Sequence, residues 1–215
     1  MTNLRSTPIG PLLGKAQQRI YPKNQIVLYQ GDLPPYMFLL KQGEIKVYDI
    51  DEQGNEKVLY IMRPDSIFPF TSYLGRRTEV MWFYAALSDV EAYAISYEDL
   101  ALRLRQDPEL ALYLLEKLTT DMHEAFVRIA SMSKTTTRPK LTAALKFLCV
   151  YHTTTMKNGW RRVNFVVSHQ LLADMTGITR ESATLAMRQL QDERITRSPK
   201  LGTLEINFDR LIQQD

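Results

Sequence analysis

The hydrophobic and polar residues of the first hundred positions form short alternating runs separated by turns. In Glu44–Ile50 the alternation has a period of two residues, which exposes one face of a strand and buries the other. Other β-rich runs are Ile26–Leu28, Met37–Leu40, Val58–Ile61 and Val90–Ile95. Turn sequences separate the runs at Gln30–Asp32, Gln42–Gly43, Asp51–Asn55 and Pro64–Asp65. Short strands with this spacing predict a small antiparallel barrel or jelly roll.

From Ser96 onward the pattern becomes helical. A segment opens at Tyr97, and a stronger start follows at Asp107, which can cap free amides ahead of a proline that suits the first helical position. Apolar residues then recur at steps of four and three: Ala111, Leu115, Leu118, Met122, Ala125, Ile129 and Met132. This heptad seam predicts pairing with a second copy of the helix, and the alternative is a helix packed on its own barrel. Thr135–Pro139 is expected to end the helix as a hinge, because the residue before proline avoids helical angles.

The last third of the sequence has the pattern of a separate unit. Its predicted elements are a helix over Lys140–Tyr151, a strand over Trp160–Val167, helices over Ser168–Thr176 and Thr179–Leu190, and a hairpin of Ile195–Thr196 with Thr203–Phe208. Gly177-Ile178 joins the two short helices, and this arrangement is the helix-turn-helix layout. Ser168 and Thr179 are expected N-caps, and Gly177 supplies a left-handed turn without a Cβ penalty.

The second of these short helices has two chemically different faces. Its predicted buried face consists of Ala183, Ala186, Met187 and Leu190, and the opposite face carries Arg180, Glu181, Ser182, Thr184 and Arg188. Arginine can bond guanine bidentately, glutamate can accept from cytosine, and hydroxyls suit phosphates. We therefore predict binding of double-stranded DNA, and the alternative is a pair of polar-faced helices that bind nothing.

Composition and charge narrow the classes of function. The chain has 215 residues, 45% hydrophobic and 24% charged, which is ordinary globular usage and excludes disordered or fibrous classes. Residues 139–215 carry 11 basic and 7 acidic side chains, whereas residues 1–138 carry 16 and 17. The positive charge therefore lies in the predicted DNA-binding third. With no long apolar run and no secretory signal, we expect a cytoplasmic protein that does not interact with membranes.

Several segments along the chain occur in an order, spacing and length typical of one family. They are Gln30–Asp32, Phe38–Tyr48, Gly54, Pro64-Asp65, Glu91–Tyr97, Ser168–Ala173 and Thr179–Thr184. Over roughly residues 20–211 the chain resembles the cyclic AMP receptor protein/FNR (Crp/Fnr) family of bacterial transcription regulators. The resemblance implies an α+β fold: an N-terminal antiparallel β-roll (a double-stranded β-helix like that of cyclic-nucleotide-binding domains) in residues 1–106, a dimerisation helix and hinge in 107–138, and a C-terminal winged helix-turn-helix in 139–215. It also implies a homodimer on a near-palindromic operator, with RNA polymerase as a partner.

The resemblance also assigns roles to the DNA-binding third. In the family a basic residue and a glutamate at the start of the recognition helix read base edges, and these positions hold Arg180 and Glu181. With the flanking phosphate-binding positions, the exposed helix face and a lysine in the presumed wing, the candidate DNA-binding residues are Ser168, His169, Gln170, Thr179, Arg180, Glu181, Ser182, Thr184, Arg188 and Lys200. Many relatives have an arginine four residues after that glutamate. Here the position holds Leu185, which can contact a thymine methyl but cannot donate to guanine.

The nucleotide cassette of the family is altered in this sequence. Relatives that bind cyclic nucleotides use Gly-Glu for the ribose and an arginine with a small neighbour for the phosphate, whereas here Phe68-Pro69 and Val80-Met81 occupy these positions. A cyclic phosphate would lose its charge partner, so we expect that cyclic AMP is not the effector. The alternative is a cyclic-nucleotide-responsive regulator or regulatory subunit in which Arg76 or Arg77 replaces the phosphate clamp.

Aromatic residues are frequent in the part of the sequence where the nucleotide would bind. The candidate pocket residues are Phe68, Phe70, Tyr73, Phe83 and Tyr84. They predict either a pocket for an apolar or aromatic effector or a filled pocket that senses nothing.

The rest of the sequence predicts no cofactor, no metal site and no catalytic site. A single cysteine, Cys149, excludes an internal disulfide and an iron–sulfur cluster, and we expect it to be a buried, inert thiol. None of the three histidines lies in the predicted barrel, which argues against haem sensing and against a cupin-type metalloenzyme. Met122 or His123 could ligate a metal, but a heptad methionine is more often a core residue. We therefore expect a protein that is not an enzyme.

Overall fold

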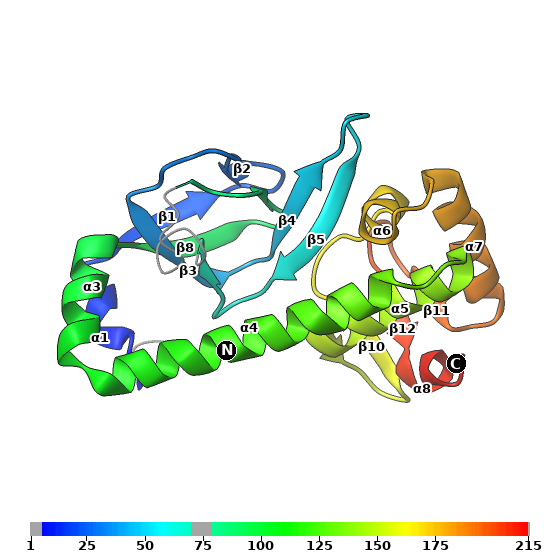
Figure 1. Ribbon diagram of the computed structural model, residues 1–215. Helices are drawn as coiled ribbons and strands as arrows, with labels where there is room; N and C mark the ends of the chain where they lie inside the picture. The colour runs from blue at the N-terminus through cyan, green and yellow to red at the C-terminus, as the bar shows by residue number, and fades with distance from the viewer. Residues whose placement is uncertain (1–5, 70–78, 215) are drawn as a thin grey trace. The chain divides into compact units, whose positions relative to one another are not determined.

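The computed structural model describes residues 6–69 and 79–214. The chain divides into two compact units, one formed by residues 1–49 and 60–124 and the other by residues 50–59 and 125–215. Helix α4 (Pro108–Met132) is continuous and contributes its first part to one unit and its last part to the other (Figure 1). The segment expected as a separate dimerisation region, 107–138, is thus shared between the two units.

Two four-stranded sheets form the β-roll, which belongs to the first unit apart from Ile50–Leu59. Their orders are β1-β8-β3-β6 and β2-β7-β4-β5. The strands are β1 (Gln17–Tyr21), β2 (Ile26–Leu28), β3 (Tyr36–Gln42), β4 (Ile45–Ile50), β5 (Glu56–Met62), β6 (Ile67–Phe68), β7 (Phe83–Ala86) and β8 (Val90–Ser96). β8 pairs antiparallel with β1 and β3, and β7 pairs antiparallel with β2 and β4. The predicted antiparallel β-roll is confirmed; strand β1, whose side chains are mostly exposed, lacks the alternation that would have predicted it.

The inner faces of the two sheets enclose an apolar core. Ile45 and Val47, two residues apart on β4, are both buried in it, as the period-two pattern predicted. Its other buried members are Leu28, Phe38, Leu40, Met62, Phe68, Val80, Tyr84, Ala86, Val90, Ala92 and Ala94. The turn before β4 requires glycine, because Gly43 has a φ of 85° and an added Cβ would lie 2.3 Å from the carbonyl oxygen of Asp89.

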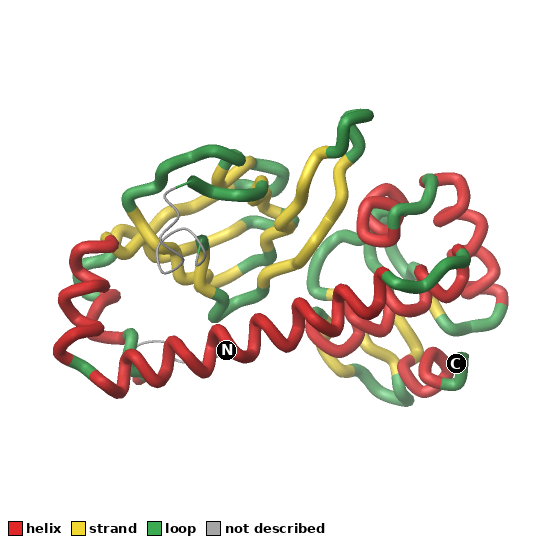
Figure 2. Tube along the Cα trace, in the orientation of Figure 1, coloured by secondary structure: helices red, strands yellow, loops and turns green. Residues whose placement is uncertain are grey.

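Helices predominate after Ser96 (Figure 2). Helix α3 (Tyr97–Gln106) begins at Ser96, whose hydroxyl accepts the amide of Asp99 at 3.1 Å. The carboxylate of Asp107 accepts the amide of Leu110 at 3.1 Å, which confirms the predicted start of α4. These helices and α1 (Gly10–Leu13) pack in a second apolar cluster, made of Ile9, Leu12, Leu13, Met37, Leu39, Ile67, Ile95, Leu100, Leu110 and Leu114.

Helix α4 keeps an apolar stripe in solvent. Leu110 and Leu114 are buried, whereas most of the predicted heptad seam is not. The exposed apolar side chains of the helix are Leu112, Leu115, Met122, Phe126, Val127, Ile129 and Met132. We define the apolar stripe as Leu115, Met122, Phe126 and Ile129. The stripe does not pack on the chain's own β-roll. The alternative interpretation of the seam, a helix packed on its own barrel, therefore does not hold for these side chains.

The second unit combines a four-stranded sheet with short helices. The sheet order is β11-β12-β10-β9. The elements are α5 (Thr137–Tyr151), β9 (Thr153–Thr155), β10 (Trp160–Val163), α6 (His169–Thr176), α7 (Arg180–Asp192), β11 (Thr196–Arg197), β12 (Glu205–Asn207) and α8 (Phe208–Ile212). The predicted helix-turn-helix and hairpin are confirmed.

Two boundaries in this unit differ from the prediction, and one short helix was not predicted. α5 begins at Thr137 rather than Lys140, because Pro139 lies in its first turn, where no intrahelical amide bond is needed. β10 ends at Val163 rather than Val167. The short helix α8 was not predicted; it begins at Asn207, whose side chain accepts the amide of Arg210 at 3.1 Å.

Candidate DNA-binding site

Local hydrogen bonds shape the helix-turn-helix formed by α6 and α7. The hydroxyl of Ser168 accepts the amide of Leu171 at 3.0 Å at the start of α6. Gly177 ends α6 with φ 63° and ψ 39°, the left-handed conformation that glycine adopts without strain. The hydroxyl of Thr179 accepts the amide of Ser182 at 3.1 Å and begins α7. The predicted caps and the predicted glycine turn are therefore confirmed.

Helix α7 buries one face and exposes the other. Its buried residues are the four predicted ones: Ala183, Ala186, Met187 and Leu190. Arg180 is exposed at the N-terminal end of the helix, and Glu181 and Arg188 are exposed on the side opposite the buried residues. Within the described part of the chain, none of these three takes part in an ion pair. Their charged groups are therefore available to a ligand, and Arg180 and Glu181 lie in the first turn, the end of a recognition helix that enters the major groove.

The remaining candidate residues of the two helices are held by neighbours. His169 on α6 contacts Thr184 on α7, with 2.9 Å between Nδ1 and Oγ1. The Thr179 hydroxyl donates to the Ser182 hydroxyl at 2.9 Å. The Gln170 side-chain amide donates to Asp174 at 2.7 Å. Because these contacts fix the side chains before any ligand binds, the surface is preorganised.

The hairpin of β11 and β12 carries a lysine in its loop. At its base, a buried carboxylate pairs with two arginines. Lys200, in the loop between the strands, is exposed. Glu205 on β12 is 1% exposed and accepts hydrogen bonds from Arg162 on β10 at 2.7 and 2.9 Å and from Arg197 on β11 at 2.7 Å. Burial acts to raise the pKa of Glu205, but the two guanidinium groups hold it below the usual range. Sequence analysis missed this cluster because its members come from three separate strands.

Comparison with known proteins agrees with the geometry in both parts of the chain. Residues 18–107 match the pattern of the cyclic nucleotide-binding domain family, and residues 140–213 match that of the Crp-like helix-turn-helix domain. The chain belongs to the Crp/Fnr family of transcription regulators. Members of this family are DNA-binding transcription regulators, a role that is not enzymatic.

Curated Crp/Fnr relatives span nearly the whole chain. The cyclic AMP receptor protein of Thermus thermophilus is 26% identical over 200 residues, covering 92% of this chain and 87% of the relative. The global nitrogen regulator of Synechococcus elongatus is 24% identical over 215 residues, covering 100% and 96%.

Solved structures show the same fold. A CRP/FNR-family transcriptional regulator from Thermus thermophilus superposes with a TM-score of 0.72 at 23% identity and covers 92% of this chain and 97% of its own. FixK2 from Bradyrhizobium japonicum gives a TM-score of 0.77 at 16% identity, with 93% and 97% covered.

The positions that the family resemblance assigns to the nucleotide cassette hold buried apolar side chains. Phe68 is 1% exposed and stacks between Phe38 and Tyr84, with ring centroids 5.2 and 5.5 Å away. Pro69 is buried, and Val80, at the position of the phosphate-binding arginine, is 2% exposed within the same core. The three stacked rings fill the inner face of the roll at this point.

The other residues expected around the effector do not share this environment. Phe83 precedes Tyr84 on β7, so its ring points to the opposite face of the sheet, where it packs against Tyr29 and Tyr48 at centroid distances of 6.3 and 5.3 Å. Phe83 and Tyr84 therefore cannot line one cavity inside the roll. Phe70, Tyr73, Arg76 and Arg77 lie outside the described residues.

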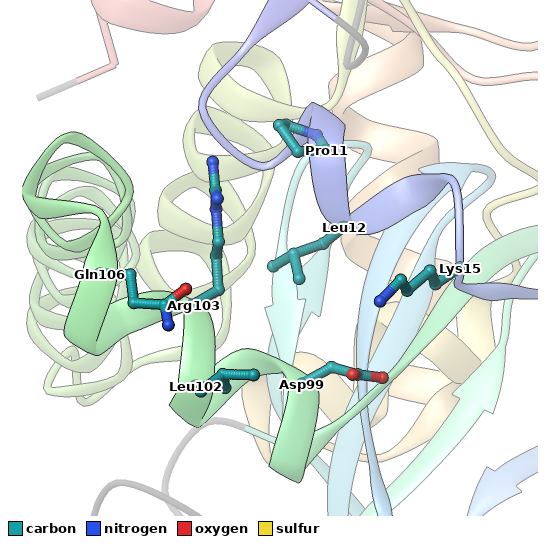
Figure 3. A pocket seen from close by; sticks show the side chains of 7 residues that line it. All are labelled: Pro11, Leu12, Lys15, Asp99, Leu102, Arg103 and Gln106. Atoms are coloured by element: carbon teal, nitrogen blue, oxygen red, sulfur yellow. The ribbon is translucent and has the colours of Figure 1, made fainter.

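A pocket of about 240 Å³ lies on the first unit between α1 and α3 (Figure 3). Its lining residues are Pro11, Leu12, Lys15, Asp99, Leu102, Arg103 and Gln106. Two of its charged groups already have partners, because Arg103 pairs with Asp107 at 2.9 Å and Asp99 accepts the Ser96 hydroxyl at 2.7 Å. Of the predicted effector residues that the structure describes, Phe68, Phe83 and Tyr84, none lines this pocket.

The remaining predictions concern the thiol, metals and membranes. Cys149 is fully buried on α5, and burial raises the pKa of its thiol to about 11, so it stays protonated at neutral pH. Within residues 6–69 and 79–214, His, Cys, Asp and Glu side chains form no group of three that could hold a metal ion. Across the same residues, no helix combines the length and apolar character needed to span a bilayer.

Proposed function

We propose that this Crp/Fnr regulator binds a near-palindromic operator as a homodimer and reads it with Arg180 and Glu181. The observation that carries the proposal is the exposed first turn of α7, where both side chains are free of ion pairs in the described part of the chain. An arginine without a counter-charge can bond N7 and O6 of guanine, and glutamate can accept from N4 of cytosine. Thr179, Ser182 and Ser168, at the helix starts, are suited to phosphates.

The apolar stripe of α4 supports the homodimer. Met122, Phe126 and Ile129 are 56%, 62% and 63% exposed, whereas Leu110, Leu114, Glu124 and Arg128 of the same helix are buried. A stripe at heptad spacing is matched by a second copy of itself across a two-fold axis. Such a dimer places two recognition helices about 34 Å apart, one turn of DNA, and so requires a near-palindromic site. RNA polymerase contact on that DNA is part of the proposal.

The packing of the β-roll supports an effector other than a cyclic nucleotide, or no effector. Relatives include a cyclic AMP receptor protein, and one structural neighbour is a c-di-GMP responsive regulator. In this chain Phe68, Pro69 and Val80 are buried at the positions where the resemblance expects a hydroxyl acceptor and a cation for cyclic AMP. Each lost charge-assisted hydrogen bond costs about 1.5–3 kcal/mol of binding free energy.

Selection of bound sites from random DNA tests the base reading. We expect the wild type to select a near-palindrome. Arg180→Ala should lose about 1–3 kcal/mol of binding free energy per half-site and relax the preference at one base position, and Glu181→Ala should relax the preference at another. Lys200→Ala is the matched control, because a phosphate contact weakens all sequences alike and lowers the salt slope by about one. Unchanged selected sequences for both Arg180→Ala and Glu181→Ala would contradict the proposal.

Calorimetry with cyclic AMP and cyclic GMP tests the effector. We expect no binding at micromolar concentrations. Micromolar binding to the wild type, abolished in an Arg76→Ala, Arg77→Ala double variant, would instead support the cyclic-nucleotide-responsive alternative.

A further inference from the structure

Leu185 is an exposed leucine on the recognition helix. It is 61% exposed, whereas the buried apolar residues of α7, among them Leu190 and Met187, are at most 5% exposed. Leu185 therefore contributes little to the core of this unit, and its side chain lies among charged residues in water.

The helical geometry places Leu185 on the face that would meet DNA. An α-helix turns by about 100° per residue, which gives the direction of each side chain around the axis of α7. The direction opposite the mean of its four buried side chains lies within about 30° of Leu185, Glu181 and Arg188. Leu185 lies one turn after Glu181 and one turn before Arg188. An apolar group thus lies between the two charged side chains that are available to bases.

The chemistry of the major groove limits what such a side chain can recognise. Leucine has no donor or acceptor, and the apolar group that base edges present in this groove is the C5-methyl of thymine. We propose that Leu185 determines a thymine in the operator by packing against that methyl group. This inference rests on the proposed function, since it requires α7 to enter the major groove.

The surroundings of Leu185 provide room for the contact. A groove of about 200 Å³ is lined by Thr137, Arg138, Ser182, Leu185, Ala186 and Gln189. Gln189 is exposed, and its amide can donate to O4, the acceptor beside the methyl group of thymine. Arg138 is engaged by Glu193 in a bidentate pair at 2.6 and 2.7 Å, so it does not compete for the base.

Replacing thymine by deoxyuridine removes only the methyl group and tests the contact directly. Each thymine of the site selected by the wild type is replaced singly, and dissociation constants are measured at fixed salt. We expect one thymine per half-site to lose about three- to fivefold in affinity on replacement, the effect of exposing about one methyl group. Leu185→Ala should bind the thymine and deoxyuridine sites equally.

The control is Leu201→Ala, because Leu201 is a fully exposed leucine of the same unit outside α7 and should leave the discrimination unchanged. Two results would overturn this inference but leave base reading by α7 intact. In the first, the wild type selects a specific site but binds it equally well with deoxyuridine at every thymine. In the second, the selected site contains no thymine. A wild type that selects no sequence overturns the proposed function instead. The deoxyuridine series needs no variant, so it decides the question even if Leu185→Ala misfolds.

Discussion

His169 and Thr184 link the two helices of the helix-turn-helix through one shared hydroxyl. Nδ1 of His169 lies 2.9 Å from Oγ1 of Thr184, and the same hydroxyl donates to the carbonyl oxygen of Arg180 at 2.8 Å. A hydroxyl has one proton, so Nδ1 is the donor in the contact with Thr184. Nε2 of the neutral ring is then left as the basic atom, on the surface that we propose binds DNA.

We predict that the neutral imidazole of His169 carries its proton on Nδ1. Nitrogen-15 NMR of the wild type should show this tautomer, and Thr184→Val, which removes the acceptor but keeps the shape, should shift the ring toward the Nε2–H form. The variant should also lose about 1 kcal/mol of stability. A wild-type spectrum dominated by the Nε2–H form would contradict the assignment.

Gly177→Ala should destabilise the helix-turn-helix through the backbone alone. An added Cβ meets no atom within 4 Å, so the cost is that of holding alanine at a φ of 63°, about 1–2 kcal/mol. Asparagine tolerates this conformation better, so Gly177→Asn serves as the control and should lose less. Hydrogen exchange of the α6 and α7 amides in the full chain measures both, and a neutral Gly177→Ala would contradict the argument.

Charges on the apolar stripe of α4 should separate the dimer. Met122→Glu with Ile129→Glu would bury four like charges per dimer, which we expect to give monomers in sedimentation velocity at micromolar concentration. Thr120→Glu is the control, because Thr120 is exposed about 160° around the helix from Met122 and should leave the dimer intact. A wild type that is already monomeric at this concentration would refute the dimer.

Asp121 on α4 should make stability depend on pH. Burial, followed by the nearby Glu124 carboxylate, raises the pKa of Asp121 to about 6, although Arg63 and Lys117 act in the opposite direction. The folded state thus binds this proton more tightly than the unfolded state, so the contribution of Asp121 to stability falls as pH rises from about 4 to 6.

Asp121→Asn removes this ionisation. It should stabilise the protein at pH 8 by about 1–3 kcal/mol and change it little at pH 4, as measured by urea unfolding. Equal effects at both pH values would show that the carboxyl does not titrate in this window.

Features that depend on neighbouring residues in the sequence were predictable. The caps at Ser168 and Thr179, the left-handed Gly177 and the start of α4 at Asp107 each involve groups within a few positions of one another. The alternation in β4 and the four buried residues of α7 follow from the periods of strand and helix. Pro139 shows the limit of such rules, because a proline that usually marks a boundary lies inside the first turn of α5.

The β-roll, the long helix, the helix-turn-helix and the polar face that carries Arg180 and Glu181 could thus be predicted, since local propensity and periodicity encode them. The stacking of Phe68 between Phe38 and Tyr84, and the pairing of Glu205 with arginines from two other strands, became visible in the three-dimensional fold. These contacts join residues 8 to 43 positions apart, and their existence depends on strand register and on which faces meet. Register is set by the packing of the whole sheet, so no short window of sequence contains it.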